Sequence, residues 1–373
     1  MLSKKLFLIA VIILVWISFP SVGASSNVWR QFYETDQNQS VYSMIATMDG
    51  GYALAGGYGN INDFWLVKID QGGNIQWNRT YGGEKKDYAT GIVETGDGGY
   101  ALAGSTQSFG QGEEDFWLVK TDADGNMQWN RTYGGPNSEE VYSIVKVSDG
   151  GYALAGDGLF VKTDVYGNME WNKTIIGDKV RAMIQSSDGG YILAGRLWLM
   201  KIDSAGLMEW KKTYEETGIV YFSHGLIETP DGGYAKIGAG LLIKTDEYGN
   251  MEWNQTYHGN LAFSLINTSD GGYAFVLDSQ LIKTDTQGNV VWSERYEPRY
   301  EWSILHLSSV IETSDGGYII AGNLFEFFTG KSVILLGKTD EYGIIPEFPL
   351  WTALPLVIAV VLVTVIYRKK LTD

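Results

Sequence analysis

The 373-residue sequence contains no cysteine, seven prolines and three histidines. The absence of cysteine excludes disulfide frameworks, thiolate catalysis and cysteine-ligated zinc. The three histidines, His224, His258 and His306, leave little material for imidazole chemistry. Basic residues are also scarce, since 28 Lys and Arg stand against 44 Asp and Glu, a formal net charge of −16. This balance argues against nucleic acid as a partner, because a nucleic-acid-binding surface needs clustered basic side chains.

Glycine and aromatic residues are abundant where proline and cysteine are not. The sequence has 47 glycines, 13 tryptophans, 23 tyrosines and 14 phenylalanines. So many aromatic side chains exclude a disordered chain, and so few prolines exclude collagen and proline-rich linkers. Much glycine together with many aromatics predicts short strands joined by tight turns.

The first 24 residues have the three parts of a secretory signal. Lys4 and Lys5 form a basic start, Leu6–Phe19 is an apolar run, and small residues stand at Val22 and Ala24. This order predicts a signal peptide, residues 1–24, cleaved after Ala24. An uncleaved N-terminal anchor is the alternative.

The C-terminal end predicts a membrane span. Leu350–Tyr367 is mostly apolar and long enough, at about 1.5 Å per residue, to cross a hydrocarbon core of about 30 Å with little tilt. Arg368, Lys369 and Lys370 follow at once and place this end in the cytoplasm. The chain is then expected to be a single-pass membrane protein whose body lies on the extracellular face of the cell membrane. A buried core helix is the alternative for the apolar run.

Directly before the apolar run stand Pro346, Glu347 and Phe348. A Pro-Glu-Phe motif, an apolar helix and a basic end together resemble the PEF-type C-terminal sorting signals of archaeal surface proteins. The resemblance covers residues 346–373 and implies a membrane sortase that recognises the tail and replaces it with another anchor. A plain membrane anchor without processing explains the same residues.

Between the two ends, one unit is repeated seven times. Asp-Gly-Gly-Tyr recurs every 39 to 52 residues, beginning at Asp49, Asp97, Asp149, Asp188, Asp231, Asp270 and Asp315. Each copy comes after one short apolar run and before a second, and a third run ends in a lysine followed by Thr-Asp or Ile-Asp. A turn such as Asp122–Asn126 follows, and a fourth run carries a tryptophan such as Trp129. We call these four predicted strands A, B, C and D.

Four strands in about 44 residues, repeated seven times, predict an all-β, seven-bladed β-propeller over residues 25–345. The run Leu118–Trp129, with its Lys-Thr-Asp, Gly-Asn and tryptophan, resembles the quinoprotein-like propeller repeat. The Asp-Gly-Gly-Tyr copies are similar to repeats of archaeal cell-surface propellers. These resemblances imply the fold and not an activity. Quinoprotein enzymes are longer and often use a vicinal cysteine pair, so their cofactor is not expected here.

The strand count predicts how the ring closes. The seventh repeat ends at Gly343 without a D strand, whereas Val28–Tyr33 precedes the first A strand and matches the D strand Gln128–Tyr133. The N-terminal strand is therefore predicted to complete blade seven. Closure also removes the free sheet edges on which β proteins aggregate.

The recurrent residues have structural explanations. Asp-Gly-Gly is typical of a tight hairpin in which Asp caps the turn and Gly adopts positive φ. The D-strand tryptophans are expected to pack between blades, and the seven C-strand lysines are expected to be structural. Asp122–Asn126 lacks the closing glutamate of a calcium loop. No motif of a nucleophilic or metal-dependent enzyme is present, so no catalytic residue is assigned.

Six Asn-x-Ser/Thr sequons are candidate glycosylation sites in a secreted chain: Asn38, Asn78, Asn130, Asn172, Asn254 and Asn267. Four of them follow the D-strand tryptophan, so the repeat itself also explains their recurrence.

Loop length selects a candidate binding face. The B–C connections and the D–A connections share one face of the disc, and the B–C connection is long only in blades one, two and seven, at 57–63, 105–115 and 323–331. Binding sites are commonly built on such loops, although tolerated insertion explains them equally. The candidate binding residues are Tyr58, Phe109, Glu113, Glu114, Asp115, Glu139, Glu140, Trp302, Phe325, Phe327 and Phe328.

The expected function is that of a membrane-anchored extracellular binding, adhesion or scaffold module. Exposed aromatics beside carboxylates suit a glycan or a surface-protein ligand. The acids could also recruit calcium, and no other cofactor is expected. The alternative is a surface hydrolase that cleaves glycans or peptides with a pair of carboxylates.

Overall fold

The computed structural model describes residues 28–345, with gaps at 36, 60–61, 215–222 and 260. The signal peptide, the sorting motif Pro346-Glu347-Phe348 and the C-terminal apolar run lie outside the described residues and stay predictions. Within the described part of the chain, no helix is long and apolar enough to span a membrane.

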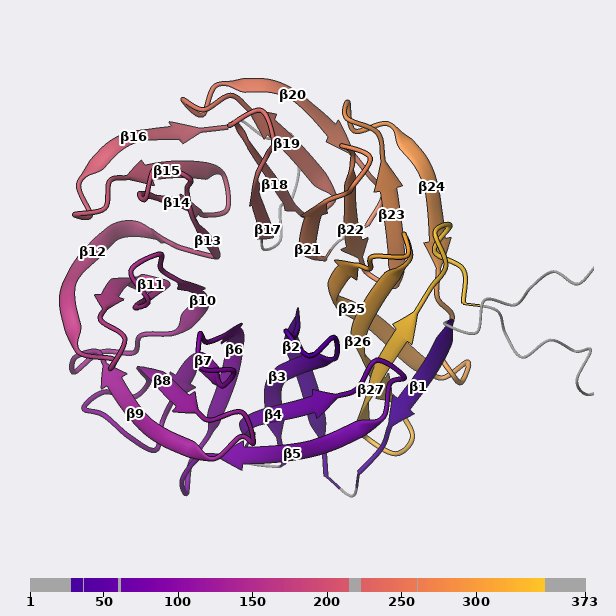
Figure 1. The fold of residues 1–373 in the computed structure, drawn as a ribbon, viewed down its shortest axis with the longest axis horizontal. Coiled ribbons are helices and arrows are strands. Elements are labelled where there is room, and N and C mark those ends of the chain that lie inside the picture. The colour runs from indigo at the N-terminus through magenta and orange to yellow at the C-terminus, as the bar shows by residue number, and fades with distance from the viewer. Residues whose placement is uncertain (1–27, 36, 60–61, 215–222, 260, 346–373) are drawn as a thin grey trace, which may run out of the picture.

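The chain folds into seven antiparallel blades arranged around a central axis (Figure 1). Strand A of each blade lies innermost, and strand D lies at the rim. Blade one contains β2 (Gln39–Ala46), β3 (Tyr52–Tyr58), β4 (Asp63–Ile69) and β5 (Ile75–Tyr81). Blade two contains β6 (Asp87–Glu94), β7 (Tyr100–Thr106), β8 (Asp115–Thr121) and β9 (Met127–Tyr133). Blade three contains β10 (Val141–Lys146), β11 (Tyr152–Thr163) and β12 (Met169–Lys179), and β11 carries both strand B and strand C.

The remaining blades follow in chain order around the ring. Blade four contains β13 (Ala182–Gln185), β14 (Tyr191–Ala194), β15 (Trp198–Ile202) and β16 (Met208–Thr213). Blade five contains β17 (Ser223–Glu228), β18 (Tyr234–Gly238), β19 (Leu241–Thr245) and β20 (Met251–Thr256). Blade six contains β21 (Ala262–Asn267), β22 (Tyr273–Leu277), β23 (Gln280–Thr284) and β24 (Val290–Arg295). Blade seven contains β25 (Ser303–Glu312), β26 (Tyr318–Glu326), β27 (Lys331–Lys338) and the N-terminal β1 (Trp29–Tyr33).

The predicted closure by the N-terminal strand is confirmed. β1 pairs antiparallel with β27, from Trp29 opposite Lys338 to Tyr33 opposite Ile334, in a sheet of order β1-β27-β26-β25. Strand D of blade seven therefore comes from the start of the fold and its other three strands from the end. Figure 1 shows the first and last strands side by side.

The core consists of layers between neighbouring blades. Every residue of β8 in the middle of blade two is buried, because a blade covers each face of the sheet. β9 at the rim is exposed except at Trp129 and Tyr133. One cluster joins Phe64 and Leu66 of blade one to Ile92 and Leu102 of blade two. Equivalent clusters join the other neighbouring blades.

The predicted role of the tryptophans is confirmed at six junctions between blades. Trp77 of blade one, for example, lies edge-on to Tyr100 of blade two with ring centroids 6.0 Å apart. The tyrosine that ends strand D adds a hydrogen bond across most junctions, as when the Tyr133 hydroxyl donates to the Gly167 carbonyl at 2.6 Å. In blade three this tyrosine is replaced by Ile175. The N-terminal strand keeps the tyrosine, and Tyr33 donates to Gly73.

The Asp-Gly-Gly turns and the lysines form one repeated unit. In blade three, Asp149 accepts a hydrogen bond from the Gly151 amide at 2.8 Å, and Gly150 has φ of 91°. The buried Lys162 reaches Asp149 at 2.8 Å and so ties strand C to the A–B turn. The lysine pairs with the turn aspartate in all seven blades. These lysines are structural, as expected.

These ion pairs should make the propeller sensitive to acid. Hydrogen bonds from the lysine, then from a neighbouring Ser or Thr hydroxyl, lower the pKa of Asp49, Asp188 and Asp315 from 3.8 to about 2. Because the pKa is lower in the folded state, each pair stabilises the fold above pH 3.8, and this stabilisation is lost as the pH falls towards 2. With allowance for the exposure of the carboxylates, each pair contributes about 1 kcal/mol. The melting temperature should therefore fall steeply between about pH 4 and pH 2.

Calorimetry across this pH range checks the prediction. Asp49→Asn should melt lower at neutral pH and show a shallower dependence on pH, because one of the contributing carboxylates is gone. A melting temperature that stays constant down to about pH 2 would contradict the assignment.

Candidate binding surface

Blade seven projects beyond the other blades on the face formed by the B–C and D–A connections. β25, β26 and β27 have 10, 9 and 8 residues, and their pairing continues to Ser303 opposite Glu326 and Glu326 opposite Lys331. The predicted loop 323–331 is therefore mostly a β-hairpin, because the flanking apolar residues pair across the strands. Only residues 327–330 form its turn.

The two faces of this projection differ. Leu305 and Leu324 form a cross-strand pair that is buried in the core shared with blade six. The next pair along, Ile304 and Phe325, lies on the opposite face of the sheet and is exposed. Asn323 shares that face. Its side chain accepts a hydrogen bond from the Val41 amide of blade one at 2.7 Å and donates one to the Val41 carbonyl at 2.8 Å. The exposed pair therefore faces the blade-one side of the ring.

Further aromatic side chains surround this pair. Trp302, Phe327 and Phe328 are 46, 57 and 82% exposed. The Phe325 and Phe327 rings meet edge-on at 5.5 Å, and Phe328 meets Trp302 at 5.6 Å. The backbone amide of Phe327 donates to the Trp302 carbonyl at 3.3 Å, which joins the two ring pairs. We call Trp302, Ile304, Phe325, Phe327 and Phe328 the aromatic patch.

Stacking and ion-pair contacts of Arg299 and Tyr300 support the aromatic patch. Tyr300 stacks parallel on Trp302, with ring centroids 5.3 Å apart and an interplanar angle of 1°. Arg299 lies 5.3 Å from the centre of the Tyr300 ring, over Phe32 of β1, and forms an ion pair with Glu34. The N-terminal strand thus supports the patch as well as closing the ring.

The aromatic candidates of blades one and two lie apart from the patch. Tyr58 is half-buried against Trp65, with ring centroids 5.8 Å apart, and Phe109 packs on the buried Trp117 at 5.1 Å. Among the ring contacts of the described chain, none joins either residue to the patch. These two side chains mainly cover the tops of their own blades.

Most of the candidate acidic residues accept hydrogen bonds from other residues of the same loop. Asp115 is a buried residue of β8 and accepts hydrogen bonds from the amides of Gln111 and Gly112 at 2.8 and 3.0 Å. Glu114 accepts one from Gln107 at 2.7 Å. Glu139 accepts the Gly135 amide at 3.2 Å, and Glu140 accepts the Tyr142 hydroxyl. Glu113 is exposed.

One pair of carboxylates was not identified from the sequence. A Cβ on Gly82 would run into Asp63 and would lie 3.0 Å from Asp87. Burial raises the pKa of Asp63, and the neighbouring Asp87 raises it further. The sequence signal is the Asp that begins strand C in both blade one and blade two, at Asp63 and Asp115. In the part of the chain that is described, no group of three His, Asp or Glu is placed to hold a metal ion.

The sequons occupy two kinds of position. Asn78, Asn130, Asn172 and Asn254 are exposed on the rim strands. Asn38 is exposed, and its side-chain oxygen accepts the Ser332 amide at 3.3 Å. Asn267 is half-buried and donates to the Glu228 carbonyl at 2.8 Å, so the rim sites are the more accessible.

Solved structures with a similar fold are WD40-type propellers and a bacterial extracellular domain. The WD40 propeller domain of Doa1 superposes with a TM-score of 0.60 at 12% identity, over 83% of this chain and 96% of its own. The WD40 repeats of RRP9 give 0.63 at 10% identity, over 85% and 98%. The extracellular domain of a protein described as a one-component system of B. thetaiotaomicron gives 0.57 at 13% identity, over 86% of this chain and 43% of that one.

At these identities the likeness concerns the fold alone, and it confirms the predicted seven-bladed β-propeller. No protein-family model and no curated protein matches the chain. The resemblances to archaeal surface repeats, to quinoprotein repeats and to a sorting signal therefore stay predictions.

Proposed function

We propose that this protein is an extracellular binding or adhesion module, anchored to the membrane by residues 346–373, and that its ligand contacts the aromatic patch. The observation that carries the proposal is the group of five exposed apolar side chains on the projection of blade seven. Contiguous apolar surface of this kind marks interaction sites in soluble domains. β-Propellers commonly serve as rigid binding scaffolds, and connections on one face commonly carry the site.

The chemistry of the patch favours a glycan or a surface protein. Aromatic rings offer flat apolar faces to sugar rings or to apolar side chains of a partner. The parallel stack of Tyr300 under Trp302 fixes the orientation of the Trp302 ring, which lowers the entropy lost on binding. The exposed acid Glu297 precedes this stack in the sequence and Glu301 lies between its two residues, and both can accept hydrogen bonds from hydroxyl or basic groups.

The positions of the two ends of the fold are compatible with an aromatic patch that faces away from the membrane. β1 begins at Trp29 beside Lys338, the last residue of β27, on the face that carries the A–B and C–D turns. The last described residue, Ile345, follows the C–D turn of the same blade. An anchor after Ile345 would turn this face to the membrane and leave the aromatic patch on the far side. Protease added to intact cells should then release the propeller.

The proposal is tested by screening the full chain on arrays of glycans and surface proteins. Trp302→Ala combined with Phe327→Ala should weaken binding to the selected ligand at least tenfold, because buried aromatic anchors contribute about 2 kcal/mol or more each. The melting temperature should change little, since these side chains are exposed. Tyr166→Ala removes an aromatic that is 66% exposed on the opposite face and serves as the matched control.

Two outcomes would contradict the proposal. Binding that is unchanged in the patch variant but lost in the Tyr166 control would move the site to the other face. Cleavage of an arrayed glycan or peptide that is lost in Asp63→Asn would support the alternative, a carboxylate-dependent hydrolase. The raised pKa of Asp63 beside Asp87 is the observation that favours this alternative.

A further inference from the structure

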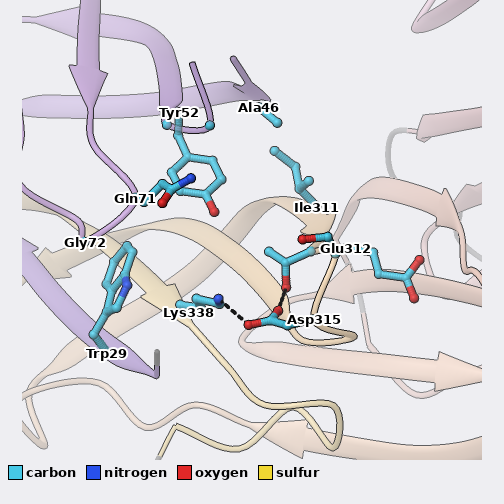
Figure 2. Close-up of a pocket in the computed structure, with 13 residues that line it drawn as sticks. Trp29, Ala46, Tyr52, Gln71, Gly72, Ile311, Glu312, Asp315 and Lys338 are labelled. Atoms are coloured by element: carbon cyan, nitrogen blue, oxygen red, sulfur yellow. Dashed lines mark hydrogen bonds and ion pairs between the residues drawn. The ribbon is translucent and has the colours of Figure 1, made fainter. Parts of the chain in front are cut away.

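A pocket of about 520 Å³ lies between blades seven and one on the face of the A–B and C–D turns (Figure 2). Trp29 of β1 and Lys338 of β27 line one side, and Tyr52 and Gln71 of blade one line the other. Asp315 lies beside Lys338, and its carboxylate points to the Lys338 ammonium group. A second pocket of about 280 Å³ shares Gln71 and two glycines with the first, so the two form one groove over the turns of blade one. We call the junction between blades seven and one the seam, and this groove the seam groove.

At the other junctions, an aromatic contact fills this position. The D-strand tryptophan of one blade meets the tyrosine after Asp-Gly-Gly of the next blade at 5.6 to 6.3 Å. Trp29 and Tyr52 are the corresponding residues at the seam, and although both are described, their rings make no such contact. Trp29 does pack on Gly73, where a Cβ would lie 2.7 Å from its ring, as the other D-strand tryptophans pack on their turn glycines. The space between the two rings is the groove.

A hydrogen bond between turns is also different at the seam. The A–B turn of one blade usually donates a backbone amide to a side chain at the end of strand A of the next blade. Ser187 donates to Glu228 at 3.0 Å, and Met48 donates to Glu94 at the same distance. Ser269 donates to Glu312 at 2.8 Å. At the seam the donor is Ser314 and the corresponding residue of blade one is Ala46, which has no acceptor in its side chain.

The lysine of blade seven has fewer carboxylate partners than the lysines of blades three and five. Lys162 binds both Asp149 and Glu170 at 2.8 Å, and Lys244 binds both Asp231 and Glu252 at 2.8 Å. The residue before the tryptophan supplies the second carboxylate, and on the N-terminal strand this residue is Val28. Lys338 pairs with Asp315 alone, at 2.6 Å, as Lys283 of blade six, where Val291 precedes the tryptophan, pairs with Asp270 alone. The Lys338 side chain is 13% exposed, against 6% for Lys283 and 4% for Lys162 and Lys244.

We propose that the seam groove binds an acidic peptide segment of a partner protein. A carboxylate of the segment accepts the Ser314 amide and pairs with Lys338, and an apolar or aromatic side chain enters between Trp29 and Tyr52. Each of these interactions has a counterpart between residues of the same propeller at other junctions. The groove therefore leaves open, for a ligand, contacts that other junctions make within the chain. The backbones of Gly50, Gly51 and Gly72 border the groove and leave room for an extended segment.

The site is independent of the aromatic patch and lies on the opposite face. A seam groove that binds no peptide would leave the proposed function of the aromatic patch unaffected. A patch that binds no ligand would likewise leave the proposal for the seam groove unaffected. With both sites, the propeller would connect two partners, which is the behaviour of a scaffold.

The test uses the full chain and a displayed library of random seven-residue peptides. The library should yield peptides that combine Asp or Glu with an aromatic residue. Ala46→Glu should weaken their binding at least tenfold, because the new carboxylate takes the Ser314 amide as Glu94, Glu228 and Glu312 take theirs. This variant should also melt no lower than the parent chain, which separates a blocked site from a damaged fold.

A matched pair of lysine variants supplies the control. Lys338→Met should weaken the peptides about tenfold, the loss expected for one charge-assisted hydrogen bond. Lys201→Met removes the equivalent lysine of blade four, which is 12% exposed and paired with Asp188, and should leave peptide binding unchanged. Selected peptides without acids, or full binding by the Ala46→Glu variant, would overturn the proposal. Binding seen only after removal of residues 346–373 would also overturn it, because the chain's own tail would then be the occupant.

Discussion

A chain that lacks Val28–Tyr33 is expected to lose most of the stability of the propeller. The deletion removes the five-residue pairing of β1 with β27, the contact of Trp29 with Gly73 and the hydrogen bond from Tyr33 to the same turn. It also exposes β27 from Ile334 to Lys338 as a free sheet edge. The loss should exceed about 5 kcal/mol, a large part of the 5–15 kcal/mol typical of folded proteins, and the melting temperature should fall by more than about 10 °C.

Thermal unfolding and light scattering check this result. Removal of residues 1–27 alone is the matched control, because it keeps β1 and should melt like the full chain. The longer deletion should also self-associate, since the free edge of β27 can pair with another copy. A truncated chain that stays monomeric and melts within about 2 °C of the control would show that β1 contributes little to the ring.

Ring closure could be predicted because the repeat is regular. Trp29 and Tyr33 have the spacing of Trp129 and Tyr133, and the seventh repeat has no such pair after Gly343. The hairpin turns, the structural role of the lysines and the packing of the tryptophans could be predicted for the same reason. A position repeated seven times in equivalent surroundings is explained by the fold before any ligand is considered.

The candidate site was predicted only in part. Trp302, Phe325, Phe327 and Phe328 do lie together, because pairing of β25 with β26 brings the D–A connection beside the B–C hairpin. The sequence did not predict that 323–331 is largely a hairpin. Nor did it predict that Asp115 is buried under its own loop, because a carboxylate in a loop can bind backbone amides or face solvent with the same residue pattern.

The seam groove has a sequence signal only after the repeats are aligned. Ala46 stands where blades two, five and seven have Glu and blade four has Gln. Val28 stands where blades one to five have Glu or Gln before the tryptophan, and blade six has Val291 there. These departures show which internal partners are missing. They do not show that the Trp29 and Tyr52 rings are separated, because that depends on how blades seven and one approach each other when the ring closes.

Gly125→Ala should destabilise the propeller by about 3 kcal/mol. Gly125 has φ of 76°, where an L-residue is strained by about 1–2 kcal/mol. An added Cβ would also lie 2.6 Å from the Trp77 ring and 2.9 Å from Cγ of Arg79, both on the neighbouring blade. Overpacking of this kind costs about 1–3 kcal/mol. Every junction has the same contact between a turn glycine and a tryptophan, including Gly73 with Trp29 at the seam, so the substitution probes how the blades hold together.

Gly150→Ala separates the two causes. Gly150 has φ of 91°, but a Cβ there would meet nothing within 4 Å, so this variant carries the backbone strain without the clash. Denaturant unfolding of both variants should give a loss for Gly125→Ala that is larger by about 1–3 kcal/mol. Equal losses would mean that the Trp77 ring moves aside freely and that the junctions depend less on this contact than on the buried apolar layers. Replacing Trp77 by Leu should then restore little stability to Gly125→Ala, whereas a true clash would be relieved by the smaller side chain.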